Sequence, residues 1–111
     1  MYKIVLIDFK FTEVNKSKLR PALILTNSNK YEDFIVAAIT SKIPTNPEKG
    51  DVILKSDDKN FYKTGLEVTS LIKLTKIATV NSRRIKGELG VLPKGHENKV
   101  QKGIKSVFSL S

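Results

Sequence analysis

The residues best suited to chemistry are an arginine before one apolar run and two hydroxyl residues that end the next. Arg20 precedes Pro21, and Thr40 and Ser41 close the segment 34–41. The proline ring restricts the preceding arginine to extended conformations. A guanidinium held at the mouth of a buried strand can bind a phosphate with a planar fork of donors and stays charged at any working pH. The alternative is that Arg20 is a solvated loop residue, as most arginines beside strands are.

Antiparallel pairing of these two segments would place the start of one beside the end of the other. The Arg20 guanidinium and the Thr40 hydroxyl would then converge on one phosphate, flanked by Lys18, Lys42 and Lys73. Such a site suits RNA cleavage by transesterification, in which the 2′-hydroxyl of the substrate attacks the adjacent phosphorus. Neither Arg20 nor Thr40 is a free general base, because a guanidinium stays protonated and a hydroxyl is too weak.

The charge of the chain favours a polyanionic partner. The 111 residues carry 20 Lys and Arg against 11 Asp and Glu, a net charge of +9. Residues 1–72 hold 11 basic and 9 acidic side chains, whereas residues 73–111 hold 9 and 2. This excess is typical of proteins that bind nucleic acid, although a lysine-rich surface can also serve solubility alone.

Several other chemistries find no support in the sequence. The chain has no cysteine and one histidine, His96, and it contains no P-loop, GxGxxG or HExxH motif. We therefore expect neither a metal nor a cofactor. The apolar run 4–7 is too short to cross a membrane, and we expect a cytoplasmic protein.

The apolar patterns predict short strands followed by one helix. Val100, Ile104, Val107 and Phe108 share one face of a helix that begins near Pro93 and carries His96 as a solvated residue. Strands are predicted at residues 2–9, 22–25, 34–41, 51–55, 65–74 and 76–80, with a loop at 10–19 and an undecided segment at 81–92. The fold class is therefore mainly β with a C-terminal α-helix, a small bent barrel or sandwich in a single domain spanning 1–111.

Five segments of the sequence resemble those of a known protein family. The segments IVLIDFKFTE, KLRPALILTN, FIVAAITSK, GLEVTSLIKLTKIATV and RRIKGELGVL occur in this order. They are similar to the MazF/PemK toxin endoribonucleases of type II toxin–antitoxin systems. The resemblance covers residues 3–110 and implies a small SH3-like β-barrel of the CcdB/PemK type, usually a homodimer. It also implies metal-independent cleavage of single-stranded RNA (mRNA) at short sequences, and a cognate antitoxin that folds a tail across the RNA groove.

The resemblance assigns roles to individual residues. It makes Arg20 and Thr40 the catalytic pair, and it places Ser41 at the RNA. The RNA-binding set that we expect is Lys18, Ser41, Lys42, Lys73 and Lys76.

This chain departs from the family pattern in two places. It has Tyr2-Lys3 where members often have Gly-Asp, and it has Ala78 and Asn81 where some members carry an arginine and an aspartate. Lys73 can replace the missing cation, but Asn81 cannot act as a base.

Two other functions fit the same scaffold. One is a non-enzymatic toxin of the CcdB type that poisons gyrase through its C-terminal helix, and the other is an SH3-like RNA-binding module. A gyrase poison needs no arginine that grips phosphate. A binding module usually presents stacked aromatic residues, whereas aromatic residues here are 7% and most are expected in the core. Arg20, Thr40 and the net charge together favour the nuclease.

Overall fold

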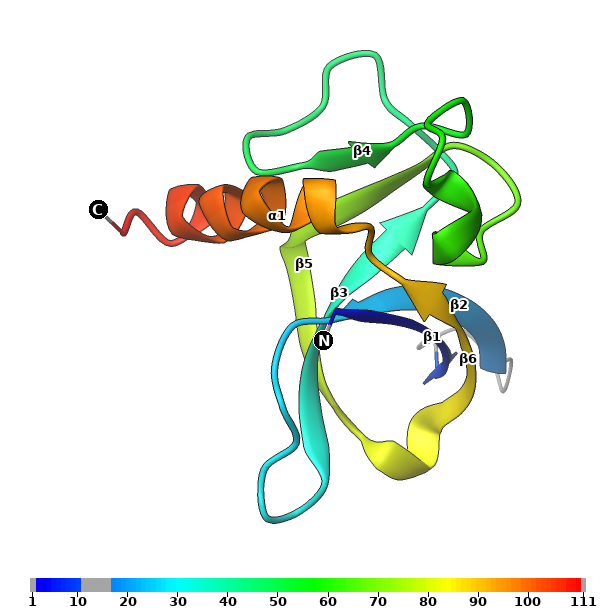
Figure 1. The fold of residues 1–111 in the computed structure, drawn as a ribbon. Coiled ribbons are helices and arrows are strands. Elements are labelled where there is room, and N and C mark those ends of the chain that lie inside the picture. The colour runs from blue at the N-terminus through cyan, green and yellow to red at the C-terminus, as the bar shows by residue number, and fades with distance from the viewer. Residues whose placement is uncertain (1, 11–16, 111) are drawn as a thin grey trace.

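The computed structural model describes residues 2–10 and 17–110 and shows a mainly β protein closed by one C-terminal helix (Figure 1). The expected fold class is confirmed. The strands are β1 (Lys3–Lys10), β2 (Ser17–Ile24), β3 (Asp33–Thr40), β4 (Val52–Leu54), β5 (Ser70–Asn81) and β6 (Ile85–Val91). Two short 3₁₀ helices, η1 (Phe61–Thr64) and η2 (Ser82–Arg84), flank β5, and α1 (Lys94–Val107) follows β6.

All six strands belong to one antiparallel sheet in the order β4-β5-β3-β2-β1-β6. The sheet curls strongly, and β3 and β5 extend together below α1 as an arm (Figure 1). A bulge interrupts their pairing, because Ala37 faces Ile77 whereas Ala38 faces Lys73. Extra residues on one strand of a pair bend that strand and increase its twist. The bulge therefore contributes to the change of direction between the two halves of β5.

The two faces of the curled sheet bury separate apolar clusters. The larger lies on the α1 side and includes Ile4, Leu23, Ala37, Leu74 and Val100. The second lies on the opposite face of the central strands and consists of Val5, Ile7, Ala22, Ile24, Val36 and Val80. Adjacent residues of β1 and β2 alternate between these clusters, because successive side chains of a strand point to opposite faces. The continuous apolar runs of these strands thus reflect burial on both sides.

Helix α1 packs unusually close to the sheet at Gly103. A Cβ atom added there would lie 2.5 Å from Cδ1 of Leu74 and 2.9 Å from the carbonyl oxygen of Gly50. Gly50 itself has a φ of +93°, a conformation that favours glycine. The two glycines therefore let the helix and the loop before β4 approach each other, and the period-based prediction of this helix is confirmed.

Three boundaries differ from the sequence predictions. The strand that contains Arg20 begins at Ser17, so the predicted loop ends earlier; its residues 11–16 lie outside the described part of the chain. The predicted strand 65–74 was wrong in its first half, since residues 65–69 precede β5. The strands predicted at 65–74 and 76–80 are instead one continuous element from Ser70 to Asn81. The undecided segment 81–92 contains η2 and β6.

Candidate active site

The pairing register of β2 and β3 relates the two residues that the sequence singled out. Ala22 pairs with Ala38, and Ile24 pairs with Val36. The same antiparallel register, continued by two residues beyond Ala22, sets Arg20 opposite Thr40. The recorded pairing stops next to Pro21, which has no amide hydrogen to donate. Arg20 is thus part of a strand rather than of a loop, which corrects that half of the alternative reading, whereas its side chain is exposed as that reading expected.

Residues opposite each other in an antiparallel pair share one face of the sheet. Arg20 pairs with Ile7 of β1, and Lys73 of β5 pairs with Ala38 of β3. Ile7 belongs to the second apolar cluster, so Arg20 lies at the rim of that cluster. Lys73 is half-buried and shares this face. Three adjacent strands therefore bring Arg20, Thr40 and Lys73 to one end of the same sheet face.

The Thr40 hydroxyl is oriented by the backbone that follows it. Its Oγ1 accepts a hydrogen bond of 3.1 Å from the amide of Lys42. A hydroxyl has one hydrogen to donate and two lone pairs, so this contact leaves the O–H hydrogen available for a phosphate oxygen. Ser41 and Lys42 are both exposed immediately beyond the end of β3. The predicted hydroxyl cluster at the strand terminus is therefore present and open to a ligand.

The remaining predicted contacts differ in their position relative to Arg20 and Thr40, which we call the Arg20 row. Lys18 is exposed and precedes Arg20 by two residues on the same strand, so it shares the face of Arg20. Lys76 is also exposed, but it lies in the bulge of β5 between the residues that pair with Ala37 and Ala38. The structure thus brings Lys18 and Lys73 to the Arg20 row and leaves Lys76 outside it.

A cleft of about 880 Å³ lies on the same sheet face, further from the row. Its apolar floor includes Ile24 and Phe34, and its lining also includes Lys3, Lys86 and Ser82. Ile24 lies four residues beyond Arg20 on β2 and therefore shares its face. The cleft extends the candidate site along the sheet, towards the turn between β2 and β3.

Asn81 has a structural task that the sequence did not show. Its Nδ2 donates to the carbonyl oxygen of Tyr31 at 2.9 Å and to Oδ1 of Asp33 at 3.0 Å. Its Oδ1 accepts from the backbone amide and from Nε of Arg83, each at 3.1 Å. An asparagine at the N-cap of a short helix is a favoured arrangement. At the position where some family members carry an aspartate, this chain therefore has a residue that joins the end of β5 to the turn before β3.

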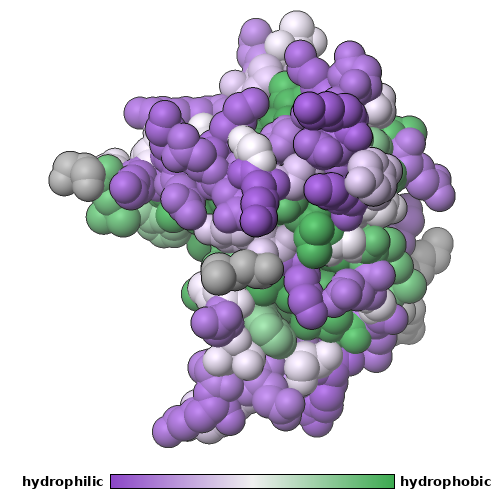
Figure 2. All heavy atoms as spheres, in the orientation of Figure 1, coloured by the Kyte–Doolittle hydropathy of each residue, from purple (hydrophilic) through white to green (hydrophobic). Residues whose placement is uncertain are grey.

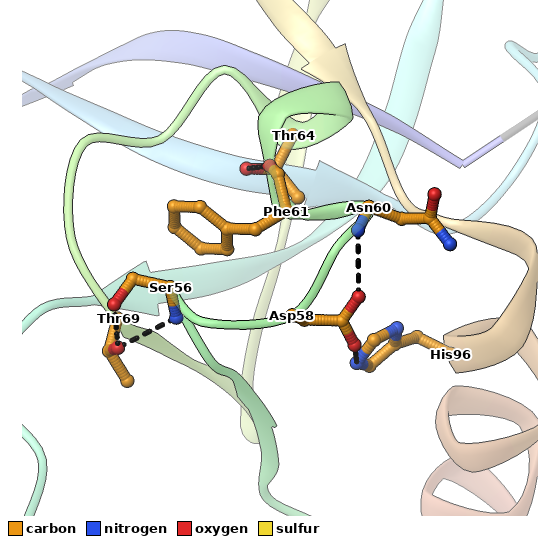
Figure 3. A network of polar contacts seen from close by, with 7 residues as sticks. All are labelled: Ser56, Asp58, Asn60, Phe61, Thr64, Thr69 and His96. Carbon is orange, nitrogen blue, oxygen red and sulfur yellow. Dashed lines mark hydrogen bonds and ion pairs between the residues drawn. The ribbon is translucent and has the colours of Figure 1, made fainter.

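His96 was expected in solvent, and this prediction was wrong. Its side chain is buried in the first turn of α1, with Nε2 4.0 Å from Oδ2 of Asp58 (Figure 3). Asp58 also accepts a hydrogen bond from the amide of Asn60, and nearby Ser56 and Thr69 are bonded to each other. This network holds the loop between β4 and η1 against the helix. His96 therefore helps to position α1. Its contact is with Asp58 of this loop and not with Arg20 or Thr40.

The described residues were also compared with the requirements of a membrane-spanning helix and of a metal site. Within residues 2–10 and 17–110, no helix is long and apolar enough to cross a membrane. The same residues contain no group of three His, Asp or Glu side chains placed to hold a metal ion.

The family model for PemK-like, MazF-like toxins of type II toxin–antitoxin systems matches residues 1–108. The chain belongs to this family. Its resemblance to the MazF/PemK toxins is thereby confirmed, and the protein is the toxin component of a type II toxin–antitoxin system. Members of the family are known as endoribonuclease toxins. A comparison with curated protein sequences finds no match.

Solved structures of the family share this fold at low sequence identity. The Mycobacterium tuberculosis toxin MazF-mt6 is similar with a TM-score of 0.77 and 20% identity, over 98% of each chain. A mycobacterial endoribonuclease in complex with its cognate antitoxin has a TM-score of 0.75 and 16% identity, over 98% of this chain and 93% of that one. A MazE–MazF complex from Deinococcus radiodurans has a TM-score of 0.75 and 17% identity, over 98% and 94%.

Proposed function

We propose that this toxin cleaves single-stranded RNA, and that Arg20 and Thr40 act on the scissile phosphate. The observation that supports the proposal is the β2–β3 register at Ala22 and Ala38, because its extension by two residues would put Arg20 opposite Thr40, on the sheet face that also carries Lys73. A cation and a hydroxyl donor on adjacent strands are suited to a phosphorane that carries negative charge on its non-bridging oxygens. Membership of a family of endoribonuclease toxins supports the same reaction.

The reaction is an internal transesterification. The 2′-oxygen of the substrate forms a bond to the adjacent phosphorus as its proton passes to solvent water, and the bond from phosphorus to the 5′-oxygen breaks as that oxygen takes a proton from solvent water. The products are a 2′,3′-cyclic phosphate and a 5′-hydroxyl. Arg20 stabilises the negative charge of the phosphorane and hydrogen-bonds the leaving oxygen, while Thr40 donates its hydroxyl hydrogen to a non-bridging oxygen. The RNA supplies the nucleophile, so the protein supplies position and charge.

The flanking cations extend the contact along the RNA backbone. Lys18, Lys42 and Lys73 lie next to the Arg20 row and neutralise phosphates on either side of the scissile bond, while Ser41 adds a hydrogen-bonding hydroxyl. Lys76, in the bulge of β5, contacts the RNA further away. Lysines adapt to phosphates without reading bases. The mRNA substrate of this reaction is in the cytoplasm, and we assign the toxin to that compartment.

The family works as dimers that bind RNA and includes toxins bound to antitoxins, and an apolar surface of this chain suits a second copy. The C-terminal half of α1 projects sideways above the arm of β3 and β5, which leaves a concave corner between them, and hydrophobic atoms gather along the underside of the helix (Figures 1 and 2). Ile35 and Ile77 of the arm are 39% and 40% exposed, and Phe108 beyond the helix is 52% exposed. We assign this corner to the homodimer, and the surface formed by Arg20 and its flanking lysines Lys18, Lys42 and Lys73 to an acidic antitoxin segment that folds on binding.

Substitutions at the row test the proposal. Cleavage of a long single-stranded RNA is measured for the wild type, Arg20→Ala, Arg20→Lys and Thr40→Val, with Lys99→Ala on the outer face of α1 as a control for loss of one positive charge. Loss of one transition-state donor typically slows a reaction by about 10²–10³. We expect such losses for Arg20→Ala and Thr40→Val, a partial loss for Arg20→Lys, and no change for Lys99→Ala. Normal cleavage by a folded Arg20→Ala variant would refute the assignment.

A further inference from the structure

The turn before β3 presents an exposed aromatic ring with a cation over it. Tyr31 is 66% exposed, and Nζ of Lys30 lies 5.1 Å from the centroid of its ring. The turn lies at the end of the β3–β5 arm, which projects away from α1 (Figure 1). Exposed tyrosines were not expected from the sequence, because its few aromatic residues were assigned mostly to the core. This ring contributes nothing to either apolar cluster.

Hydrogen bonds hold this turn in one conformation. Oδ1 of Asn29 accepts from the amides of Tyr31 and Asp33, at 2.9 Å and 3.0 Å. Asn81 binds the carbonyl oxygen of Tyr31 from the neighbouring strand, at 2.9 Å. Glu32 has a φ of +63°, which is uncommon for a residue other than glycine. Strained residues of this kind persist where the surrounding structure fixes them, and they are frequent at binding sites.

The surroundings of the ring favour a negatively charged ligand. Nε of Arg83 is bonded to Asn81, so its exposed guanidinium is held beside the residue that binds Tyr31. Arg84 follows in η2. Two carboxylates, those of Glu32 and Asp33, follow Tyr31 in the chain, and that of Asp33 accepts a hydrogen bond from Asn81. An exposed aromatic ring with Lys30 over it, and with Arg83 hydrogen-bonded to the same asparagine that holds its backbone, suits single-stranded nucleic acid, because the ring can stack on a base while the cations contact phosphates.

The cleft described above lies close to this turn, on the sheet face that also carries Arg20. Thr26, Asn27 and Ser28 line the cleft and lead into the turn. Ser82 also lines it, and its amide donates to the carbonyl oxygen of Glu32 at 2.8 Å. Thr40 lies seven residue steps after Asp33 along β3, which corresponds to about 24 Å at the usual rise of a strand. An RNA strand held at Thr40 and directed along this face would therefore reach Tyr31 several nucleotides away from the scissile phosphate.

We propose that Tyr31 stacks on a base of the single-stranded RNA substrate outside the cleavage site, with Lys30 and Arg83 on the adjacent phosphates. The proposal rests on the RNA-cleaving function proposed above and adds a second contact region to it. RNA is favoured over an acidic peptide because every base offers a π-face to the ring, whereas carboxylate side chains would engage only the cations. Stacking tolerates any base, so the contact raises affinity without setting the cleavage sequence.

The test measures binding apart from cleavage. A fluorescent single-stranded RNA of about 20 nucleotides, fully 2′-O-methylated so that it cannot undergo transesterification, is titrated with protein and followed by anisotropy. Stacking of one base contributes about a 5- to 150-fold change in the dissociation constant. We expect a weakening in this range for Tyr31→Ala and less than twofold for Tyr31→Phe, which keeps the ring. Tyr62→Ala is the matched control, because Tyr62 is 75% exposed and also adjoins a lysine; we expect it to bind as the wild type does.

Cleavage of the unmodified RNA separates this proposal from the proposed function. We expect Tyr31→Ala to raise KM and leave kcat unchanged. The stacking proposal is wrong if wild type cleaves RNA while Tyr31→Ala binds it equally well. It is also wrong if Tyr31→Ala changes the oligomeric state in sedimentation, or if it weakens binding of an oligoglutamate peptide and leaves RNA binding intact. If the RNA binding of the wild type depends on Tyr31 but the wild type cleaves no RNA, the proposed function is refuted and the stacking contact is supported.

Discussion

Replacement of Gly103 by alanine tests how closely α1 packs on the sheet. The added Cβ would lie 2.5 Å from Cδ1 of Leu74 and 2.9 Å from the backbone oxygen of Gly50. Leu74 is 1% exposed, so neither neighbour can yield without disturbing the core. Alanine is preferred over glycine inside a helix by about 1 kcal/mol, whereas overpacking a core costs about 1–3 kcal/mol. We therefore expect a net loss of about 1 kcal/mol in the free energy of unfolding, and of about 2 kcal/mol at most.

Gly95 provides the matched control in the first turn of the same helix. A Cβ atom at Gly95 would meet nothing within 4 Å, so Gly95→Ala should raise the free energy of unfolding by up to about 1 kcal/mol. Urea denaturation followed by circular dichroism gives both values, and the denaturant dependence should be unchanged. If both variants were stabilised to the same extent, the close contact between α1 and Gly50 would be refuted.

Three further predictions address the core, the turn and the charge of the site. Ile72→Ala removes a fully buried side chain and should lower the free energy of unfolding by about 2–5 kcal/mol in urea denaturation; a loss below 1 kcal/mol would contradict the described core. Asn81→Ala removes the N-cap of η2 and the bonds to Tyr31 and Asp33. It should cost about 1–3 kcal/mol, which thermal denaturation checks, and an unchanged melting temperature would speak against that role. Lys73→Ala should reduce the salt dependence of RNA binding by about 0.7 in the slope of log K against log salt; an unchanged slope would remove Lys73 from the interface.

Local sequence patterns predicted a helix or strand correctly where the environment of the segment stays the same along its length. The strand predicted at 34–41 is observed at Asp33–Thr40, and the apolar period that includes Val100 identified α1. The prediction at 65–74 placed the start of the strand wrongly, because the order of apolar and polar residues there was interpreted as a strand with one buried face. Ser70, Leu71 and Ile72 are all buried, since the sheet is covered on both sides there. No alternation marks such a strand, so its start could not be read from the pattern.

The relation between Arg20 and Thr40 was predictable because it needs only one antiparallel pairing of two recognisable strands. The bulge that offsets Lys73 from Lys76 depends on how β5 adapts to the curled sheet, and no local residue pattern encodes it. His96 is buried because a loop distant in the sequence brings Asp58 to it. The role of Asn81 was hidden for the same reason, since its partners Tyr31 and Asp33 lie about 50 residues earlier.

The chemical identity of the RNA ends left by the wild-type protein shows whether the substrate's own 2′-hydroxyl is the nucleophile. A long single-stranded RNA and its fully 2′-O-methylated counterpart are incubated with the toxin in EDTA, and the ends are determined by mass spectrometry. Internal transesterification predicts a 2′,3′-cyclic phosphate and a 5′-hydroxyl from the unmodified RNA, and no cleavage of the methylated one. A 3′-hydroxyl with a 5′-phosphate, or cleavage of the methylated RNA, would contradict it, because either result requires a nucleophile other than the substrate's own 2′-hydroxyl.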